Sequence, residues 1–345
     1  MKNDYKEMVE WTLPQVVRIN RAITKPVIKK RTGLKIVSEG ESFGAIVTNV
    51  DIGASQALLE GNIPGVAGLR SLYPGSFSEE QDSPERITAC NIYEVDPLDG
   101  TGDFKKTYDA SVIMPPTTLV TKLKRKDSGE PYTPVVSLIF ETVHEYGLVS
   151  DGTRIGFFTV TPEGEIYEVP CRLIKYDRPF DLSLPIFINR RPAYPQQCFD
   201  TKFVPYLREH FRLDIRQVSV GGAGMQALHL FRNYIEPSQQ DCPAFHKLKP
   251  LTISFNAQPD WKTWDTDPAD VIAKAIGLPE RTTIFGEKIS DHASKKKENA
   301  AATNLKDMWH PKGCVLSTDG YLQQLICQIA KIVPNFGDNL LTIDY

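Results

Sequence analysis

The feature of the sequence that most constrains the fold is a change of pattern near residue 185. Before it, residues 135–169 hold apolar, β-rich runs with a turn at 162–164, which is typical of antiparallel strands. After it, strand-like runs such as LPIFIN and IRQVSV alternate with helical segments. Alternation of this kind is typical of α/β layering. We therefore expect an α/β protein with an α+β first half, residues 1–184, and an α/β second half, residues 185–345.

Local patterns predict several elements within these halves. Apolar residues recur at helical spacing from Met8 to Val27, and Pro14 and Pro26 predict kinks or breaks because proline lacks a backbone N–H. A strand-like run at 44–50 ends in Asp51, which is typical of an acidic helix N-cap. Later helices are expected at 199–211, 225–234, 269–276 and 321–332.

Composition excludes several classes of protein. The 345 residues include 40 Lys+Arg and 43 Asp+Glu, a formal net charge of −3, so no general nucleic-acid-binding face is expected. No apolar run approaches the ~18–20 residues of a membrane span, and the N-terminal segment lacks the apolar core of a signal peptide. The six cysteines and six histidines show no metal-binding spacing. We expect a cytoplasmic protein with reduced thiols, oxygen ligands for any metal, and no membrane or nucleic-acid-polymer partner; a homodimer stays open.

The candidate chemistry lies in acidic residues next to Gly, Pro and Thr. The segment 96–101 reads DPLDGT and follows a short β-run. Its proline fixes one φ and Gly100 permits a sharp bend, so the carboxylates of Asp96 and Asp99 can point into one pocket. Backbone N–H groups after the bend can hold an anion. A solvated Asx turn is an alternative of about even weight, because Asp, Pro and Gly are all common there.

Three other acidic positions accompany this segment. Glu79 and Glu80 lie upstream of it, Asp51 ends the run VTNVD, and Asp265 lies in TWDTDP at the start of a predicted helix. Each has an ordinary interpretation when taken singly. A pair of glutamates is typical of a solvated surface, and Asp51 and Asp265 are typical of helix N-termini.

Taken together, TxxD, EE, DPLDGT and WD resemble, in this order, the inositol monophosphatase superfamily of Mg²⁺-dependent, Li⁺-sensitive phosphatases. The resemblance extends from about Val47 to Ile326. It implies a layered α-β-α-β-α sandwich of the inositol monophosphatase/fructose-1,6-bisphosphatase type. It also implies in-line hydrolysis of a small phosphorylated metabolite with two or three Mg²⁺ ions, which prefer carboxylate, carbonyl and water oxygens.

The resemblance also implies roles for single residues. Asp51 and Thr101 would orient the attacking water and are catalytic together with Glu79. The metal ligands would be Glu79, Asp96, the carbonyl of Leu98, Asp99 and Asp265. The substrate would meet Asp99, Gly100, Thr101, Gly222, Ala223 and Asp265.

The identity of the substrate is left open between alternatives. Leu98, where inositol monophosphatases commonly have Ile, favours the 3'(2'),5'-bisphosphate nucleotidase branch, with an inositol phosphate or another sugar phosphate as the alternative. The Gly-rich segment 221–224 aligns with a substrate-facing family segment, but a tight β–α turn explains it equally well. The lysines at 105–106 and 295–297 fit either a phosphate contact or a solvated surface. The alternative from another class is a non-catalytic, phosphate-binding regulatory protein, and the complete ligand set favours the enzyme.

Overall fold

A seven-stranded, mostly antiparallel sheet dominates the first half of the protein. The computed structural model describes residues 2–30, 33, 35–39, 46–101, 115–128, 130–175, 179–190, 203–256, 261–287, 309–310 and 314–333. The strands lie in the order β3 (Phe77–Ser78), β4 (Asn91–Asp99), β5 (Thr117–Lys124), β6 (Thr133–Glu141), β7 (Tyr146–Ser150), β8 (Ile155–Val160) and β9 (Ile166–Val169). Only β3 and β4 pair in parallel. The antiparallel strands predicted at 135–169 are therefore confirmed.

A smaller, mostly parallel sheet belongs to the second half. Its order is β12 (Ile215–Ser219), β11 (Ile186–Arg190), β14 (Ile253–Asn256) and β17 (Cys314–Ser317), and only the β14–β17 pair is antiparallel. Parallel neighbours need crossover connections. The connections contain α6 (Val204–Phe211), then α7 (Ala223–Phe231) and α8 (Pro243–His246). Three two-stranded pairs join β1 (Ile36–Glu39) to β2 (Ile46–Thr48), β10 (Cys171–Leu173) to β13 (Ile235–Pro237), and β15 (Trp261–Lys262) to β16 (Trp309–His310).

The N-terminal helix runs through both of its prolines. It consists of α1 (Lys2–Glu7), a π-helical turn (Met8–Thr12), α2 (Leu13–Ile19), a second π-helical turn (Asn20–Thr24) and α3 (Lys25–Lys30). Each π-helical turn is followed by a proline, Pro14 or Pro26, at the second position of the next α-helical segment. Because a proline ring clashes with the carbonyl four residues earlier, a wider turn at this place accommodates the ring. The expected irregularities are therefore local widenings of one helix.

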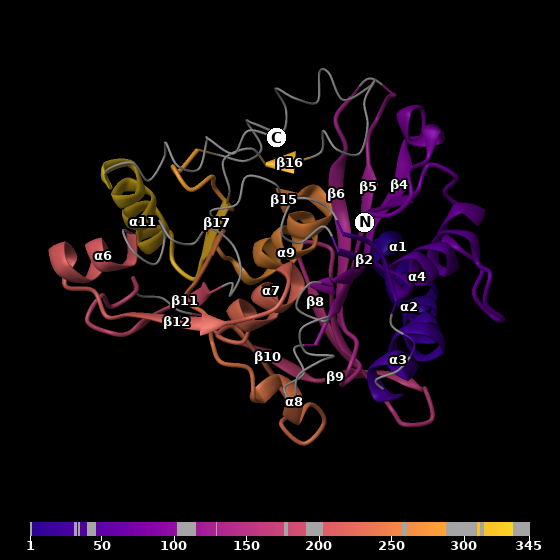
Figure 1. Ribbon diagram of the computed structural model, residues 1–345, viewed down its shortest axis with the longest axis horizontal. Coiled ribbons are helices and arrows are strands. Elements are labelled where there is room, and N and C mark those ends of the chain that lie inside the picture. The colour runs from indigo at the N-terminus through magenta and orange to yellow at the C-terminus, as the bar shows by residue number, and fades with distance from the viewer. Residues whose placement is uncertain are drawn as a thin grey trace.

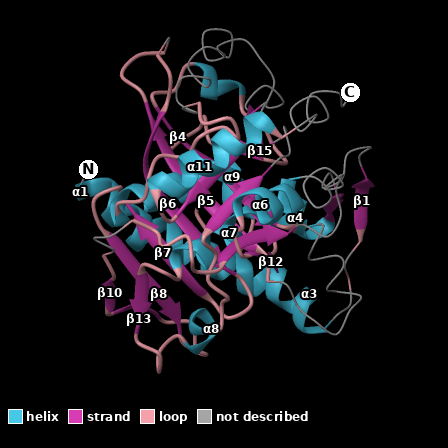
Figure 2. Ribbon diagram, turned by 90° about the vertical axis from the view of Figure 1, so that its left-hand side faces the viewer, coloured by secondary structure: helices cyan, strands magenta, loops and turns pink. Residues whose placement is uncertain are grey.

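The elements stack as five alternating layers. Figure 1 shows α2 and α4 (Asn49–Glu60) on the right, then the larger sheet, then α7 and α9 (Thr263–Ile276), then the smaller sheet, and α6 and α11 (Gly320–Ile332) on the left. Figure 2 views the molecule from the side of α6 and α11. This arrangement confirms the α-β-α-β-α sandwich. Within the described ranges, no helix is both long and apolar enough to cross a bilayer.

The two halves of the chain share one apolar core. Helices α7 and α9 come from the second half, yet Leu228 and Ile272 pack in one cluster with Leu119 and Ile139 of the larger sheet. The same cluster includes Leu316 of the smaller sheet. The opposite face of the larger sheet packs against α2 and α4, and the outer face of the smaller sheet packs against α6 and α11. Residues of α9 are therefore held against strands that precede them by more than a hundred positions.

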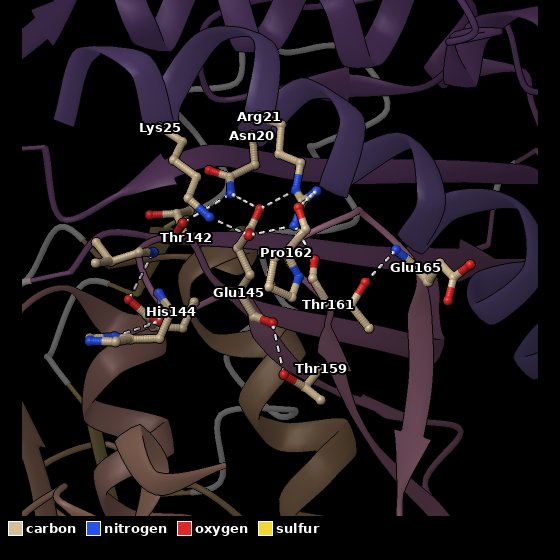
Figure 3. A network of polar contacts seen from close by, with 12 residues as sticks. Asn20, Arg21, Lys25, Thr142, His144, Glu145, Thr159, Thr161, Pro162 and Glu165 are labelled. Carbon is tan, nitrogen blue, oxygen red and sulfur yellow. Dashed lines mark hydrogen bonds and ion pairs between the residues drawn. The ribbon is translucent and has the colours of Figure 1, made fainter. Parts of the chain in front are cut away.

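A partly buried ion-pair network fixes the N-terminal helix to the turn between β6 and β7 (Figure 3). Glu145 has a left-handed backbone, with φ of 57°, and its side chain is only 4% exposed. Arg21 donates to both of its carboxylate oxygens at 2.8 and 2.9 Å, and Lys25 donates to one of them. Burial alone would raise the pKa of Glu145, but the hydrogen bonds from Arg21 and then Lys25 bring it below the ordinary value.

We expect Glu145→Gln to lower the free energy of unfolding near pH 7 by about 1.5–3 kcal/mol, because it removes charge-assisted hydrogen bonds. A lowered carboxyl pKa contributes stability above the unfolded-state value of 4.5, and this contribution is lost as the pH falls through the folded-state pKa. Urea denaturation near pH 7 and near pH 3 should therefore show a difference between wild type and variant that shrinks in acid. Glu165→Gln, on the exposed β8–β9 turn, is the matched control and should leave the free energy of unfolding unchanged at both pH values.

Candidate metal centre

Three carboxylates meet where the end of β4 faces the beginning of α9. Asp96, Asp99 and Asp265 each place one oxygen within 4.8 Å of the other two. The side chains of Asp96 and Asp99 are buried, and that of Asp265 is half-buried. The structure thus brings together three of the four carboxylates that the sequence analysis selected as metal ligands.

A β-bulge places Asp96 and Asp99 on the same face of the larger sheet. Asp96 lies opposite Leu119 of β5, and Asp99 lies opposite Thr117. Two residues of β4, Pro97 and Leu98, therefore face a single residue of β5, Thr118. Side chains three residues apart on a regular strand point to opposite faces, and the extra residue restores a common face. The Leu98 N–H donates to Asp96 Oδ1 at 2.9 Å. An Asx-type hydrogen bond is therefore present, but in a buried bulge within β4 and not in a solvated turn.

Leu98 anchors this bulge through its side chain. The side chain is buried against Ile28 of α3 and Val50 of α4 in a small apolar cluster. Its carbonyl oxygen lies on the other side, 2.7 Å from the hydroxyl of Thr101. The backbone of Leu98, and not its side chain, is thus what the site can use.

Asp51 and Thr101 form the predicted acid–hydroxyl pair. Thr101 Oγ1 lies 2.6 Å from Asp51 Oδ1 and can donate its single proton either there or to the carbonyl of Leu98. The sequence suggested Asp51 as the N-cap of α4, but Asp51 is the third residue of this helix. Thr48 is the N-cap, and its N–H donates to Asp51 Oδ2 at 2.7 Å in a capping box. Burial raises the pKa of Asp51, and the hydrogen bond from Thr101 opposes that rise.

The two residues that precede Asp265 at the beginning of α9 attach this helix to the larger sheet. The hydroxyl of Thr263 donates to Glu94 of β4 at 2.9 Å, and the ring of Trp264 meets Phe77 of β3 edge to face at 6.3 Å. Asp265 itself lies in the first turn of α9, where its Oδ2 accepts the Lys262 N–H at 3.0 Å. These contacts position Asp265, although it lies far along the chain from Asp96.

Glu79 follows β3 and is not one of the three carboxylates of the cluster. Its N–H donates to the carbonyl of Val95, and its side chain is exposed. Loss of hydration and then the charge of Asp265 raise its pKa; because the side chain reaches solvent, we regard the charge of Asp265 as decisive. Burial and then the charge of Asp51 raise the pKa of the neighbouring Glu80 to about 7.

The electrostatics of the cluster fit a hard cation. Burial, followed by the charges of Glu79, Asp99 and Asp265, raises the pKa of Asp96 well above its ordinary value. Like charges this close repel one another unless a cation or a proton lies between them. Oxygen donors at this separation match the ligands that Mg²⁺ takes in proteins, so the residues present fit the metal that the resemblance implies.

The Gly-rich segment 221–224 covers the end of the turn after β12 and the first two residues of α7, and it contacts the cluster. The N–H groups of Ala223 and Gly224 donate to Asp99 Oδ1 and Oδ2, each at 2.8 Å. Gly100 has φ of 88° and lies against Gly222, where an added Cβ would be 3.1 Å from the Gly222 nitrogen. The Ala223 amide thus faces a carboxylate of the protein. The lysines at 105–106 and 295–297 lie outside the described residues.

Comparison of the structure with solved structures identifies this architecture. An IMPase (inositol monophosphatase) from Thermotoga maritima aligns with a TM-score of 0.57 and 11% identity over 97% of this chain and 99% of its own. The chain has the inositol monophosphatase fold. A staphylococcal IMPase-I complexed with products aligns with a TM-score of 0.55 and 14% identity, over 93% of this chain and 92% of its own. An IMPase/NADP phosphatase complexed with Mg²⁺ and phosphate aligns with a TM-score of 0.53 and 15% identity, over 92% of each chain.

No family model and no curated protein matches this sequence. The inositol monophosphatase fold is therefore established by the arrangement of the elements, at identities too low to carry more than the fold. Within this chain, DPLDGT lies at the end of β4 and WD lies at the beginning of α9, as the motif resemblance implies.

The sequence analysis assigned no role to three residues that contact predicted site residues or the segment carrying one of them. Thr117 donates to Asp99 at 2.7 Å, Thr48 caps α4 and binds Asp51, and Glu94 accepts from the first turn of α9. The capping box TxxD was a signal for Thr48. Thr117 and Glu94 lie in β-runs whose pattern says only that they belong to strands.

Proposed function

We propose that the protein is a Mg²⁺-dependent phosphomonoesterase acting on a small phosphorylated metabolite. The observation that supports this most is the three-carboxylate cluster of Asp96, Asp99 and Asp265 beside the hydrogen-bonded pair of Asp51 and Thr101. Structural neighbours include phosphatases crystallised with Mg²⁺ and phosphate or with products. A non-catalytic binding protein would need the carboxylates but not the acid–hydroxyl pair, so the pair favours the enzyme.

The residues divide the work of in-line hydrolysis. Asp96, Asp99, Asp265, Glu79 and the Leu98 carbonyl would hold Mg²⁺. When bound, the metal neutralises phosphate oxygens and makes a coordinated water more acidic. Asp51 accepts a hydrogen bond from the Thr101 hydroxyl, which leaves the lone pairs of that hydroxyl free to accept a hydrogen bond from the attacking water. Phosphoryl transfer needs positioning and charge neutralisation more than covalent work by side chains, so this set suffices without a histidine or cysteine nucleophile.

A bisphosphorylated nucleoside, cleaved at the 3' or 2' position, is the substrate that we test first. The argument for it is the Leu98 motif, with inositol phosphates and other sugar phosphates as the alternative. The side chain of Leu98 is buried against Ile28 and Val50, so it is not accessible to a substrate. Leu98 therefore favours the nucleotidase branch only as a feature of the motif, and a direct assay must identify the substrate.

The experiment is a phosphate-release panel with Mg²⁺ present and with Mg²⁺ removed. Its substrates are adenosine 3',5'-bisphosphate, inositol 1-phosphate, inositol 1,4-bisphosphate, fructose 1,6-bisphosphate and NADP. We expect Mg²⁺-dependent release from at least one of them, and fastest release from adenosine 3',5'-bisphosphate. Faster release from an inositol phosphate would move the protein to the alternative substrate class. Release from none of them, together with ligand binding, would favour the regulatory protein.

Mg²⁺ should also raise the melting temperature by several degrees. A ligand that binds only the folded state at 100 times its Kd adds about 2.7 kcal/mol of stability. The expected increase comes from relief of repulsion among the carboxylates of the cluster. Scanning calorimetry with Mg²⁺, with a chelator and with Na⁺ at equal ionic strength measures it. Coincident melting curves would contradict a shared cation site.

A further inference from the structure

Asp99 accepts hydrogen bonds from three groups among the residues that the structure describes. Its Oδ2 accepts the hydroxyl of Thr117 at 2.7 Å and the Gly224 N–H at 2.8 Å, and its Oδ1 accepts the Ala223 N–H. An oxygen of a carboxylate has about two lone-pair directions, so the two donors fill Oδ2. The orientation of this carboxylate is therefore fixed from two directions, by β5 and by the first turn of α7.

Thr117 is placed to do this by the register of the larger sheet. It is the first residue of β5, lies directly opposite Asp99 across the β-bulge, and is fully buried. Gly224 packs so closely against it that an added Cβ would lie 2.3 Å from the Thr117 hydroxyl. The hydroxyl is thus enclosed between two chain segments and has Asp99 as its acceptor.

We propose that Thr117 is a positioning residue of the metal centre, which turns Asp99 so that Oδ1 faces the cation. The proposal rests on the proposed function, since it assumes a cation between Asp96, Asp99 and Asp265. Thr117 touches neither metal nor substrate. By occupying Oδ2 it prevents Asp99 from turning that oxygen toward the cation, and it keeps the carboxylate aligned with the amides of α7.

The expected size of the effect follows from outer-sphere hydrogen bonds at other metal sites. Removing a partner that orients a ligand typically weakens metal binding by about 10- to 100-fold. The short O–H···O⁻ distance and complete burial place Thr117 among the stronger partners of this kind. A hydroxyl with a merely structural role would change stability and leave the affinity of the folded protein for Mg²⁺ unaltered.

The experiment compares Mg²⁺ affinity by titration calorimetry in three variants of β5. Thr117→Val removes the hydroxyl at constant volume and should weaken Mg²⁺ binding at least tenfold. Thr117→Ser keeps the hydroxyl and should restore binding to within about threefold of wild type. Thr121→Val is the matched control, because Thr121 is equally buried on the same face of β5 and its hydroxyl has no hydrogen-bond partner among the described residues; it should bind as wild type does.

The possible results distinguish failure of the positioning role of Thr117 from failure of the proposed function. Wild-type affinity in Thr117→Val, or equal losses in Thr117→Val and Thr121→Val, would overturn the positioning role and leave the proposed function standing. Absence of Mg²⁺ binding in the wild type would overturn the proposed function itself. Should valine not be tolerated at this position, Thr117→Ala removes the same hydroxyl without adding bulk and is subject to the same comparison.

Discussion

Asp265→Asn should reduce kcat by at least ~10², equivalent to about 2.7 kcal/mol of lost transition-state stabilisation. The substitution keeps the volume and removes one negative charge from the cluster. Its remaining carbonyl oxygen can still accept the Lys262 N–H, which is now bonded to Asp265 Oδ2, so the start of α9 should be preserved. The loss should therefore come from the metal and not from folding.

Steady-state phosphate release with saturating substrate and Mg²⁺ measures this effect. The control is Asp267→Asn, which changes a carboxylate of the same helical turn outside the three-carboxylate cluster and should retain at least half of the turnover. The Mg²⁺-induced rise in melting temperature should also shrink in Asp265→Asn alone. Wild-type kcat in this variant would remove Asp265 from the site.

Gly222→Ala should abolish most activity by a purely steric route. A Cβ at Gly222 would lie 2.2 Å from Asp99 Oδ1 and 2.5 Å from its carboxyl carbon. The φ of Gly222 is −59°, outside the left-handed region that favours glycine, so the expected effect comes from crowding of Asp99. Because three donors hold the carboxylate, it can make room only by breaking hydrogen bonds to them. We expect turnover and Mg²⁺ affinity to fall at least ~10²-fold, as in the loss of a ligand.

Gly221→Ala is the control for this prediction. A Cβ at Gly221 would meet Met225 at 3.5 Å, which is ordinary van der Waals contact. Kinetics and Mg²⁺ titration of the two variants separate crowding of Asp99 from any general effect of alanine in the turn. Equal activity in both variants would mean that the contact between Gly222 and Asp99 does not matter for the reaction.

Sequence reasoning predicted what depends on neighbours along the chain. Apolar periodicity located the strands at 135–169 and the late helices, because burial of one face imposes a period on consecutive residues. Residue types, and not periodicity, drew attention to the DPLDGT segment, which the sequence analysis interpreted as a turn. A bulge is invisible in one strand alone, since it is a mismatch of length with the partner strand β5, and the register of that pairing is set by tertiary packing.

Contacts between distant segments were the part that could not be predicted. The packing of α9 against the larger sheet depends on Trp264 meeting Phe77, and neither residue carries a local sign of the other. The same holds for Thr117, whose run TTLVTKLK indicates only a strand. The motif order supplied Asp265 as a member of the cluster, but the physical reason for its position lies in contacts nearly two hundred residues apart.

The bulge in β4 supplies something besides two carboxylates on one face. A strand with a single residue between the aspartates would already set both side chains on the same side, by simple alternation. What the additional residue provides is a peptide group released from the ladder. The carbonyl of Pro97 accepts from the hydroxyl of Thr118, and the carbonyl of Leu98 lies 2.7 Å from the hydroxyl of Thr101, whereas the carbonyls of a regular strand bond to neighbouring strands. The irregularity thus turns main chain into a potential ligand that no side-chain substitution can remove, so the spacing DxxD constrains the length of this segment more than the identity of the residues within it.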